Sequence, residues 1–393
     1  MPDFGEPDYI NTAEQLVALC DKLQSQPWVA VDTEFLREKT YYPILCLIQI
    51  AAPDGTIACV DPIALDDYKP LLAIFFDKNI TKVFHACSQD LEILLYDGDA
   101  VPSPIFDTQI AAPLLGFREQ MGYAALVSEM SGHALEKAFS RTDWSKRPLT
   151  DQQIDYALDD VRYLSGIYLQ MMATLSESGR LSWLDAEFSQ YEDASRYTVN
   201  PDQAWLRMRG ADRLKGPKLS VLQHLASWRE KTAKQDDRPR NWILRDDVIM
   251  DIARQLPKDI PGLQNIRQFP EKTIQRHGKL LLSLVQEASQ QQPVPGPVRP
   301  KTTKPTRNQD ALADILLAQL TLLADKHQIN PVMIATRKQL ISLITGSTDL
   351  PVLKGWRYDI AGKELQAMLH GERSLSIRDG QLHIDAVSDT ADH

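Results

Sequence analysis

The sequence predicts an α/β domain over residues 1–195, with a mixed sheet covered by helices, followed by two small all-α domains. Up to about residue 122, short apolar runs of strand character alternate with segments of helical periodicity. From there onward the periodicity is helical, and a Pro-rich segment divides this part of the chain in two. With 393 residues, 43% of them hydrophobic, the chain is long enough for each domain to bury its own core.

The first domain is expected to begin with closely connected strands and to continue with alternating helices and strands, which favours a mixed sheet. Strands are predicted at 28–35, 46–53, 56–62 and 81–86, and helices at 13–23, 68–76, 88–96 and 107–115. Asp107 begins the last of these helices, and we expect its side chain to cap the helix by accepting hydrogen bonds from backbone amides.

The helical part of the chain is expected to form two domains joined by an extended linker. They are predicted at 205–290 and 309–376, with a Pro-rich linker at 291–308 and a polar, frayed tail at 377–393. Two pairs of segments resemble each other in the same order, namely 243–253 with 334–344 and 276–285 with 360–369. This order predicts a duplicated helical module, with chance similarity between amphipathic helices as the alternative.

Charge is distributed unevenly along the chain. Residues 1–200 hold 14 Lys and Arg against 31 Asp and Glu, a net of −17, whereas residues 201–310 hold 21 against 12, a net of +9. Residues 311–393 hold 8 against 10, a net of −2. An acidic domain is suited to holding cations, and a basic one to approaching a polyanion. The alternative is a drift of surface charge without function.

Several features predict a cytoplasmic enzyme without membrane contact. No run approaches the roughly 18 apolar residues that a membrane span requires, and the acidic N-terminus lacks the basic and apolar regions of a secretory signal. Cysteines occur at positions 20, 46, 59 and 87 without CxxC spacing. We therefore expect a reduced protein without a disulfide framework.

Asp32 and Glu34 follow the apolar run WVAV at the end of a predicted strand. Residues two apart in a strand point to the same face, so these two carboxylates would lie side by side and repel each other. A divalent cation of the Mg²⁺ or Mn²⁺ type would relieve that repulsion, because such ions prefer carboxylate oxygens. Alternatively, Asp32 merely ends the strand and Glu34 is solvated.

Two further segments carry acidic residues in suggestive positions. Asp90 lies in the first turn of a predicted helix just after a strand that ends at His85, where it could bind a cation or simply favour the helix dipole. Tyr156 and Asp160 are four residues apart in a predicted helix and therefore share one face. A phenol beside a metal-binding carboxylate could hold an attacking water. His85 is a candidate proton shuttle, or a histidine hydrogen-bonded at a strand end.

Together, the motifs DTE, HAxxxD and YxxxD resemble those of the DEDD exonuclease superfamily, in the subgroup with tyrosine in its last motif. The segments VDTEFLREKTYYPILCLIQI, DTQIAAPLLG and RTDWSKRPLTDQQIDYALDDVRYL are further similar to the ribonuclease D family within it. The helical modules resemble helicase-and-RNase-D-C-terminal (HRDC) domains in tandem. The resemblance implies a ribonuclease H-like fold for the first domain.

The resemblance also implies a reaction, which is two-metal hydrolysis of RNA from a free 3′ end with release of nucleoside 5′-monophosphates. Asp32, Glu34, Asp90 and Asp160 would hold two Mg²⁺ or Mn²⁺ ions, and Tyr156 would orient the attacking water. Precursors of tRNA are the substrates that the family suggests. We expect the protein to act as a monomer.

Contacts to RNA are predicted with less support from the sequence. Phe35 could wedge against the terminal base or lie in the core, and Gln49 could contact a sugar or base or be a strand-edge amide. Trp205 and Trp242 could stack on bases or be buried. Basic residues of the 201–310 segment would neutralise phosphates as a group, and these are Arg209, Lys215, Lys218, Arg238, Arg240 and Arg245.

Two other functions fit the same residues. A 3′–5′ DNA exonuclease would use the same acids, because the chemistry at the phosphate does not involve the 2′-hydroxyl. A non-catalytic RNA-binding scaffold is the alternative from a different class. The complete set of four acids and one tyrosine argues against the scaffold, which has no need of them.

Overall fold

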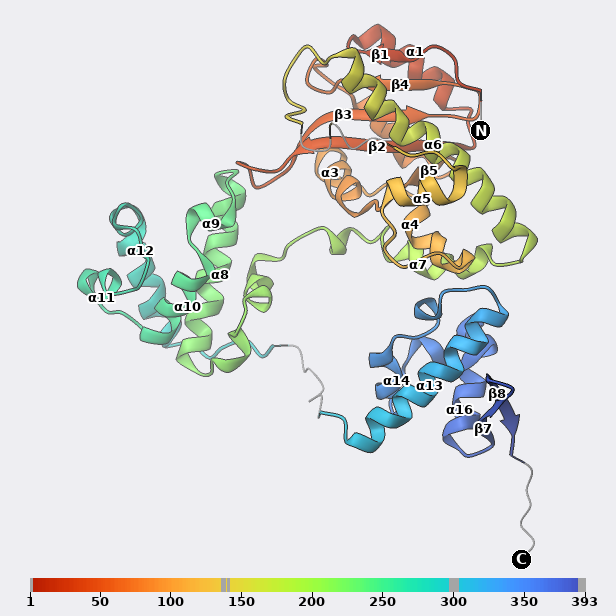
Figure 1. Ribbon diagram of the computed structural model, residues 1–393. Coiled ribbons are helices and arrows are strands. Elements are labelled where there is room, and N and C mark those ends of the chain that lie inside the picture. The colour runs from red at the N-terminus through yellow and green to blue at the C-terminus, as the bar shows by residue number, and fades with distance from the viewer. Residues whose placement is uncertain (1–2, 136–138, 140–141, 297–303, 388–393) are drawn as a thin grey trace, which may run out of the picture.

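The computed structural model describes residues 3–135, 139, 142–296 and 304–387. Its first domain contains a six-stranded mixed sheet in the order β1-β4-β3-β2-β5-β6 (Figure 1). The central strand β2 (Trp28–Leu36) is antiparallel to β3 and parallel to β5. The other strands are β1 (Asp8–Ile10), β3 (Ile44–Ala51), β4 (Ile57–Val60), β5 (Thr81–Phe84) and β6 (Ile105–Asp107).

Helices pack on both faces of this sheet, which confirms the prediction of a mixed sheet covered by helices. One face packs against α1 (Ala13–Leu23), α2 (Lys69–Phe76) and α3 (Ser88–Gly98). The other packs mainly against α4 (Thr108–Ala111), α5 (Tyr123–Ser131) and α6 (Asp151–Glu177), and the short α7 (Asp185–Ser189) follows. Strands β1 and β6 were not predicted, because three residues are too few to show a period. Asp107 caps α4 as predicted, accepting from the amides of Gln109 and Ile110.

Helix α6 is the longest element of the domain, about 40 Å at 1.5 Å per residue. Its N-terminus is closed by a capping box between Thr150 and Gln153. Just before it, Arg147 donates from Nε and Nη2 to the two carboxylate oxygens of Asp61, at 2.6 and 2.7 Å. Tyr9 donates to the same carboxylate at 2.6 Å. Because Asp61 lies just after β4, this bidentate pair fixes the start of α6 to the sheet.

The first helical region follows a connector of short 3₁₀ turns and has its own core. Val221, Leu225, Ile249 and Leu281 are fully buried in it, and Trp205 is 7% exposed beside them, which identifies this tryptophan as a core residue. The helices are α8 (Pro217–Gln235), α9 (Arg240–Ile243), α10 (Asp246–Gln255), α11 (Ile260–Gln264) and α12 (Glu271–Ser289). Part of the predicted linker, residues 297–303, lies outside the described residues.

The C-terminal region is helical, but it also contains a β-hairpin that the sequence prediction missed. Its helices are α13 (Arg307–Lys326), α14 (Arg337–Ile344), α15 (Gly355–Arg357) and α16 (Lys363–Leu369), and its strands are β7 (Arg373–Arg378) and β8 (Gln381–Ala386). The prediction of an all-α domain is therefore wrong, and so is that of a frayed tail over residues 377–386; residues 388–393 of the predicted tail lie outside the described residues. Asp379 and Gly380 both have positive φ, 52° and 74°, as the two-residue turn of a tight hairpin requires.

The C-terminal region packs directly on the first domain. The rings of Trp183 and Trp356 stack with centroids 4.5 Å apart and an angle of 5° between planes. The amide of Asn330 donates to the Pro113 carbonyl at 2.8 Å, and its side chain donates to the Phe117 carbonyl at 3.0 Å. These contacts make the C-terminal region a support for the helices beside the sheet.

None of the helices in the described residues is long and apolar enough to cross a membrane. All four cysteines fall within the described part of the chain and are free thiols, as expected.

The anchor of α6 predicts a large effect on stability. In Asp61→Asn, the guanidinium of Arg147 loses its anionic partner, and we expect the free energy of unfolding to fall by about 3 to 5 kcal/mol. Urea denaturation followed by circular dichroism at pH 7 measures this difference. The matched control is Asp8→Asn, whose ion pair with Lys22 is exposed at 3.6 Å and should contribute under about 1 kcal/mol.

The contribution of this ion pair to stability should depend on pH, in a direction set by the shift in the pKa of Asp61. Burial alone would raise the pKa of Asp61, but hydrogen bonds from Arg147 and Tyr9 hold that pKa below its ordinary value. A carboxyl whose pKa is lower in the folded than in the unfolded protein stabilises the fold. This stabilisation is fully present above the pKa of the unfolded state, about 3.9, and it is lost as the pH falls through the pKa of the folded state. The difference in the free energy of unfolding between wild type and Asp61→Asn should therefore become smaller below about pH 4. A free-energy difference that stays constant down to pH 2.5 would contradict a lowered pKa of Asp61 in the folded protein.

Candidate active site

Strand β2 and helix α6 bring three carboxylates together. Even-numbered residues of β2 face α6, since Ala30 lies in the core on that side, and Asp32 and Glu34 continue the same face. Asp160 lies on the inner face of α6, beside the buried Val161. One carboxylate oxygen each from Asp32, Glu34 and Asp160 lie within 4.8 Å of one another. The structure thus joins two of the three motifs that the sequence singled out.

Asp90 reaches the same place from α3, on the other side of β2. It is buried, and the hydroxyl of Thr33 donates a hydrogen bond to its carboxylate. Burial and the charge of Asp32 raise the pKa of Asp90 well above its ordinary value. Asp90 lies outside the three-carboxylate cluster, but its charge interacts with those of Asp32 and Glu34.

The cluster strongly resists ionisation. Burial, followed by the charges of Asp32 and Asp160, raises the pKa of Glu34 to about 9. Burial, followed by the charge of Asp159, raises the pKa of Asp160 to about 7. The pKa of Asp32 also lies well above its ordinary value, through burial and the charge of Asp160. Without a positive charge among them, these groups cannot all ionise at neutral pH.

The donor set fits a divalent cation that prefers oxygen. Carboxylates within 4.8 Å of one another can share such an ion, whose charge would offset both their repulsion and their burial. Gln49 lies directly opposite Asp32 in the β2–β3 register. Its side-chain amide is fully buried, and neither its nitrogen nor its oxygen has a hydrogen-bond partner in the described part of the chain. A buried polar group without partners is what water bound to an ion would satisfy.

A cavity of about 200 Å³ opens beside the cluster, lined by Asp32, His85, Tyr123, Asp160 and Leu164. His85 donates from Nε2 to the Met121 carbonyl at 3.1 Å, and its Nδ1 lies 2.9 Å from the Thr108 hydroxyl. Burial lowers the pKa of His85. Both ring nitrogens are therefore engaged in a neutral imidazole, which favours the structural interpretation of this residue over a proton shuttle.

Two tyrosines complete the site. Burial and the charges of Asp160 and Glu34 raise the pKa of Tyr156 to about 12, so its phenol keeps its proton beside the carboxylates. Its ring stacks against that of Trp144, with centroids 6.3 Å apart. Tyr123 donates to the backbone carbonyl of Asp160 at 2.5 Å and fixes this turn of α6. Tyr123 was missed in the sequence, where nothing in the pattern around it indicates a contact with α6.

Among the predicted RNA-contact residues, the structure assigns packing roles to some and leaves others exposed. Phe35 follows a bulge in β2 and packs against the core. Arg209, Lys215, Lys218 and Arg238 are exposed, and none forms an ion pair with the described residues. Arg240 lies 3.7 Å from Glu230, and Arg245 lies 2.9 Å from Asp247. Trp242, 60% exposed, lies between them in the sequence. These basic residues belong to the first helical region, and none of them lines the cavity at the acidic cluster.

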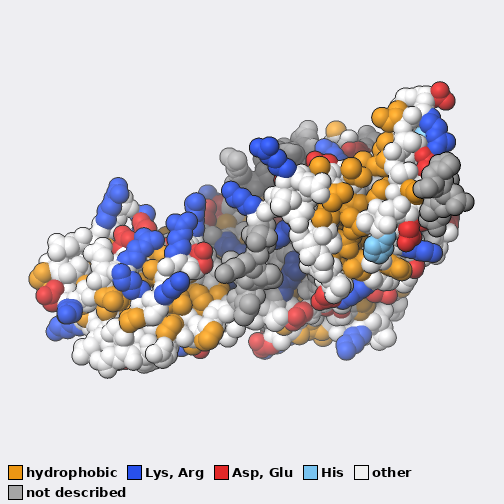
Figure 2. Space-filling model, turned by 90° about the horizontal axis from the view of Figure 1, so that it is seen from below, with side chains coloured by type: hydrophobic (Ala, Val, Ile, Leu, Met, Phe, Trp, Pro, Cys, Tyr) orange, Lys and Arg blue, Asp and Glu red, His pale blue; other side chains and the backbone are white. Residues whose placement is uncertain are grey.

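Seen from below, the regions of the molecule carry different mixtures of side chains (Figure 2). Lys and Arg side chains gather over the first helical region, at left in this view, and hydrophobic side chains over the C-terminal region at right. The exposed hydrophobic residues of the C-terminal region include Ile315 and Ile377. The basic surface and the acidic cluster thus lie on different domains.

Comparisons with known proteins identify the family of this chain. The family profile described as a 3′–5′ exonuclease matches residues 7–176, and the HRDC domain profile matches residues 218–285. The ribonuclease D of Bartonella henselae is 37% identical over 380 residues, covering 95% of this chain and 92% of the relative. The chain belongs to the ribonuclease D family. The ribonuclease D of Acidiphilium cryptum is also 37% identical, covering 98% of both chains.

The fold agrees with a solved member of this family. The crystal structure of Escherichia coli RNase D, described as an exoribonuclease involved in structured RNA processing, superimposes with a TM-score of 0.77 at 32% identity. The match covers 93% of this chain and 99% of that one. A 3′–5′ exonuclease domain followed by a helical HRDC region is therefore the architecture of this chain, as the family resemblance implied.

The crowded acids predict a metal-dependent stability. In chelator at pH 8, Asp32→Asn should unfold at a temperature about 2 to 4 °C higher than wild type, because a neutral amide replaces a carboxyl whose raised pKa opposes folding at this pH. Added Mg²⁺ should raise the midpoint of wild type and leave the variant nearly unchanged. Differential scanning fluorimetry measures both. Asp155→Asn is the control, because Asp155 is exposed on α6 and outside the cluster. If Mg²⁺ raised the unfolding midpoint of wild type and of Asp32→Asn equally, the ion would bind at another site.

Proposed function

We propose that this chain is a 3′–5′ exoribonuclease that shortens RNA from a free 3′ end and releases nucleoside 5′-monophosphates. The observation that carries this proposal is the set of three carboxylate oxygens within 4.8 Å, from Asp32, Glu34 and Asp160. Membership of the ribonuclease D family supports RNA as the substrate. A cavity of about 200 Å³ beside the acids suits one terminal nucleotide of a single strand better than a duplex.

The acids are suited to holding two divalent ions, Mg²⁺ or Mn²⁺. Asp32, Glu34 and Asp160 would hold one ion, and Asp90 together with Asp32 would hold the other. Bound ions supply an activated water and stabilise the charge on the leaving 3′ oxygen. The chain itself contributes the fixed positions of these acids, which α6, α3 and the central strand β2 hold from three directions.

Tyr156 orients the attacking water. Its phenol remains protonated at neutral pH, because burial and the neighbouring carboxylates raise its pKa to about 12. A protonated hydroxyl can both donate to and accept from a water molecule. Stacking on Trp144 fixes the ring. We propose on this basis that the chain belongs to the tyrosine subgroup of DEDD exonucleases.

The helical regions would present the RNA. We propose an exonuclease domain at 1–195, a first HRDC-like domain at 205–290 and a second that begins near residue 309. The two pairs of similar segments fall on α10 and α14 and on α12 and α16, which supports a second module of this kind. The exposed basic residues of the first region, with Trp242, would contact RNA that includes precursors of tRNA.

A gel assay with 5′-labelled single-stranded RNA tests the reaction. Wild type with Mg²⁺ or Mn²⁺ should give a ladder that shortens from the 3′ end, and chelator should abolish it. Asp32→Asn should reduce the rate at least about 1000-fold, because ion binding and charge stabilisation are both lost. Tyr156→Phe should reduce kcat roughly 10- to 100-fold with little change in KM, because the water is less well positioned.

DNA of the same sequence and Asp155→Asn serve as controls. Equal ladders on RNA and DNA would replace the proposal with a general 3′ exonuclease. If the protein bound RNA tightly but did not shorten it with either metal, it would be a non-catalytic RNA-binding protein.

A further inference from the structure

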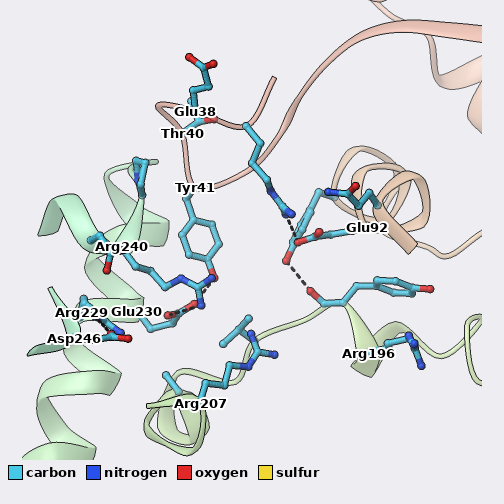
Figure 3. A pocket seen from close by; sticks show the side chains of 18 of the residues that line it. Glu38, Thr40, Tyr41, Glu92, Arg196, Arg207, Arg229, Glu230, Arg240 and Asp246 are labelled. Atoms are coloured by element: carbon cyan, nitrogen blue, oxygen red, sulfur yellow. Dashed lines mark hydrogen bonds and ion pairs between the residues drawn. The ribbon is translucent and has the colours of Figure 1, made fainter. Parts of the chain in front are cut away.

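A second pocket lies between the exonuclease domain and the first helical region. Its volume is about 820 Å³, and it is much larger than the cavity at the acids. Its walls come from the loop between β2 and β3, from α3, from the connector at 194–208, and from α8 and α9 (Figure 3). A volume of this order accommodates a ligand of several rings or a short stretch of single strand.

Five arginines line this pocket together with four acids, and the arginines differ in whether they have an acidic partner. Three are matched by acids, since Arg37 pairs with Glu92 at 2.5 Å, Arg229 with Asp246 at 2.5 Å, and Arg240 with Glu230 at 3.7 Å. The other two, Arg196 and Arg207, are exposed on the connector.

Neither Arg196 nor Arg207 has an acidic partner within 4.0 Å among the residues that the structure describes. Arg196 lies over the ring of Tyr191, 4.0 Å from its centroid. Figure 3 shows Arg207 extending from the connector toward the space between the helical region and α3. An arginine without an acid, in a concave polar site, is available to a phosphate group.

The opposite walls of the pocket are joined by a polar contact. Tyr41, in the β2–β3 loop, donates its hydroxyl to the carboxylate of Glu230 on α8, which is fully buried. The backbone amides of Tyr41 and Tyr42 donate to Asp237 at 2.9 and 3.2 Å. The loop that continues the catalytic strand is therefore fixed to the first helical region, and the pocket has a defined shape.

The pocket also adjoins the acidic cluster through shared elements. Arg37 follows Glu34 by three residues, a distance of about 10 Å along an extended chain. Ser88 and Gln89 line the pocket and immediately precede Asp90 in α3. A strand of RNA whose 3′ end lies at the acids would therefore pass into this pocket within a few nucleotides.

We propose that this pocket binds the phosphodiester backbone of RNA upstream of the cleaved bond, with Arg196 and Arg207 as the phosphate-binding residues. Tyr41 and Tyr96 line the same space and offer rings for stacking of unpaired bases. The proposal rests on the proposed exoribonuclease function, because the RNA is oriented by a 3′ end held at the acids. It adds a binding site to the group of basic residues predicted from the sequence, none of which is Arg196 or Arg207.

The test compares wild type with the double variant Arg196→Gln/Arg207→Gln in the full-length chain. Fluorescence anisotropy with a 5′-labelled 15-nucleotide RNA, in chelator so that the RNA stays intact, gives Kd at several salt concentrations. The double variant should raise Kd roughly tenfold and lower the slope of log Kd against log salt by about 1.4, since each phosphate contact on a single strand contributes about 0.7. Arg307→Gln, an exposed arginine on α13 outside the pocket, should change neither value.

Hydrolysis with Mg²⁺ separates the pocket from the acids. The double variant should lose about tenfold in kcat/KM on the 15-nucleotide RNA and keep the wild-type value on a trinucleotide, which is too short to enter the pocket. Failure of wild type to shorten either RNA would refute the exoribonuclease function itself. Wild-type behaviour of the double variant on the long RNA, or equal losses on both RNAs, would overturn the pocket proposal alone.

A competition experiment distinguishes a backbone site from a nucleotide site. Adenosine 5′-monophosphate at millimolar concentration should not displace the 15-nucleotide RNA from wild type, because a free mononucleotide offers only one phosphate. Displacement from wild type but not from the double variant would show a mononucleotide site instead and overturn the proposal. Equal thermal midpoints of the two proteins verify that the substitutions leave the fold intact.

Discussion

The mutual repulsion of the acids around Asp32 is the constraint on which this structure depends. Four carboxylates from β2, α3 and α6 meet in a partly buried space, where burial and like charge both oppose ionisation. Left to themselves, these groups would move apart. They remain together because each is carried by an element that is fixed elsewhere. Strand β2 is central in the sheet, hydrogen-bonded to β3 and β5, and cannot shift without breaking both ladders.

Helix α6 needs the most support, because it lies across the sheet and carries both Tyr156 and Asp160. The bidentate pair of Arg147 with Asp61 fixes its start, and the hydroxyl of Tyr123 fixes its middle. Buried residues along its inner face pack against β2, β3 and β4. The C-terminal region contributes from outside, through the stack of Trp356 on Trp183 just beyond the end of the helix. Contacts of α6 that lie far from the acids thus keep Tyr156 and Asp160 in place.

The uneven distribution of charge along the chain can be explained by this arrangement of the domains. A domain with a net charge of −17 over residues 1–200 repels a polyanion, except where cations are bound at the acids. The following segment, with a net of +9, provides the compensating attraction, and the β2–β3 loop joins the two through Tyr41 and Glu230. Arg196 and Arg207, which have no acidic partner among the described residues, lie at this junction, where an RNA strand on its way to the acids would pass.

The sequence by itself determined the faces of the elements: a period of two placed Asp32 with Glu34, and a spacing of four placed Tyr156 with Asp160. It also determined the strongly periodic helices and strands and, through three motifs, the family. Only the tertiary structure decided which faces meet. It brought Asp90 to Asp32 through Thr33 and left the amide of Gln49 without a partner among the residues that the structure describes. It also buried Trp205 while exposing Trp242, and closed the β7–β8 hairpin at a two-residue turn. The physical reason is that periodicity is local, whereas partners depend on packing between segments far apart in the chain.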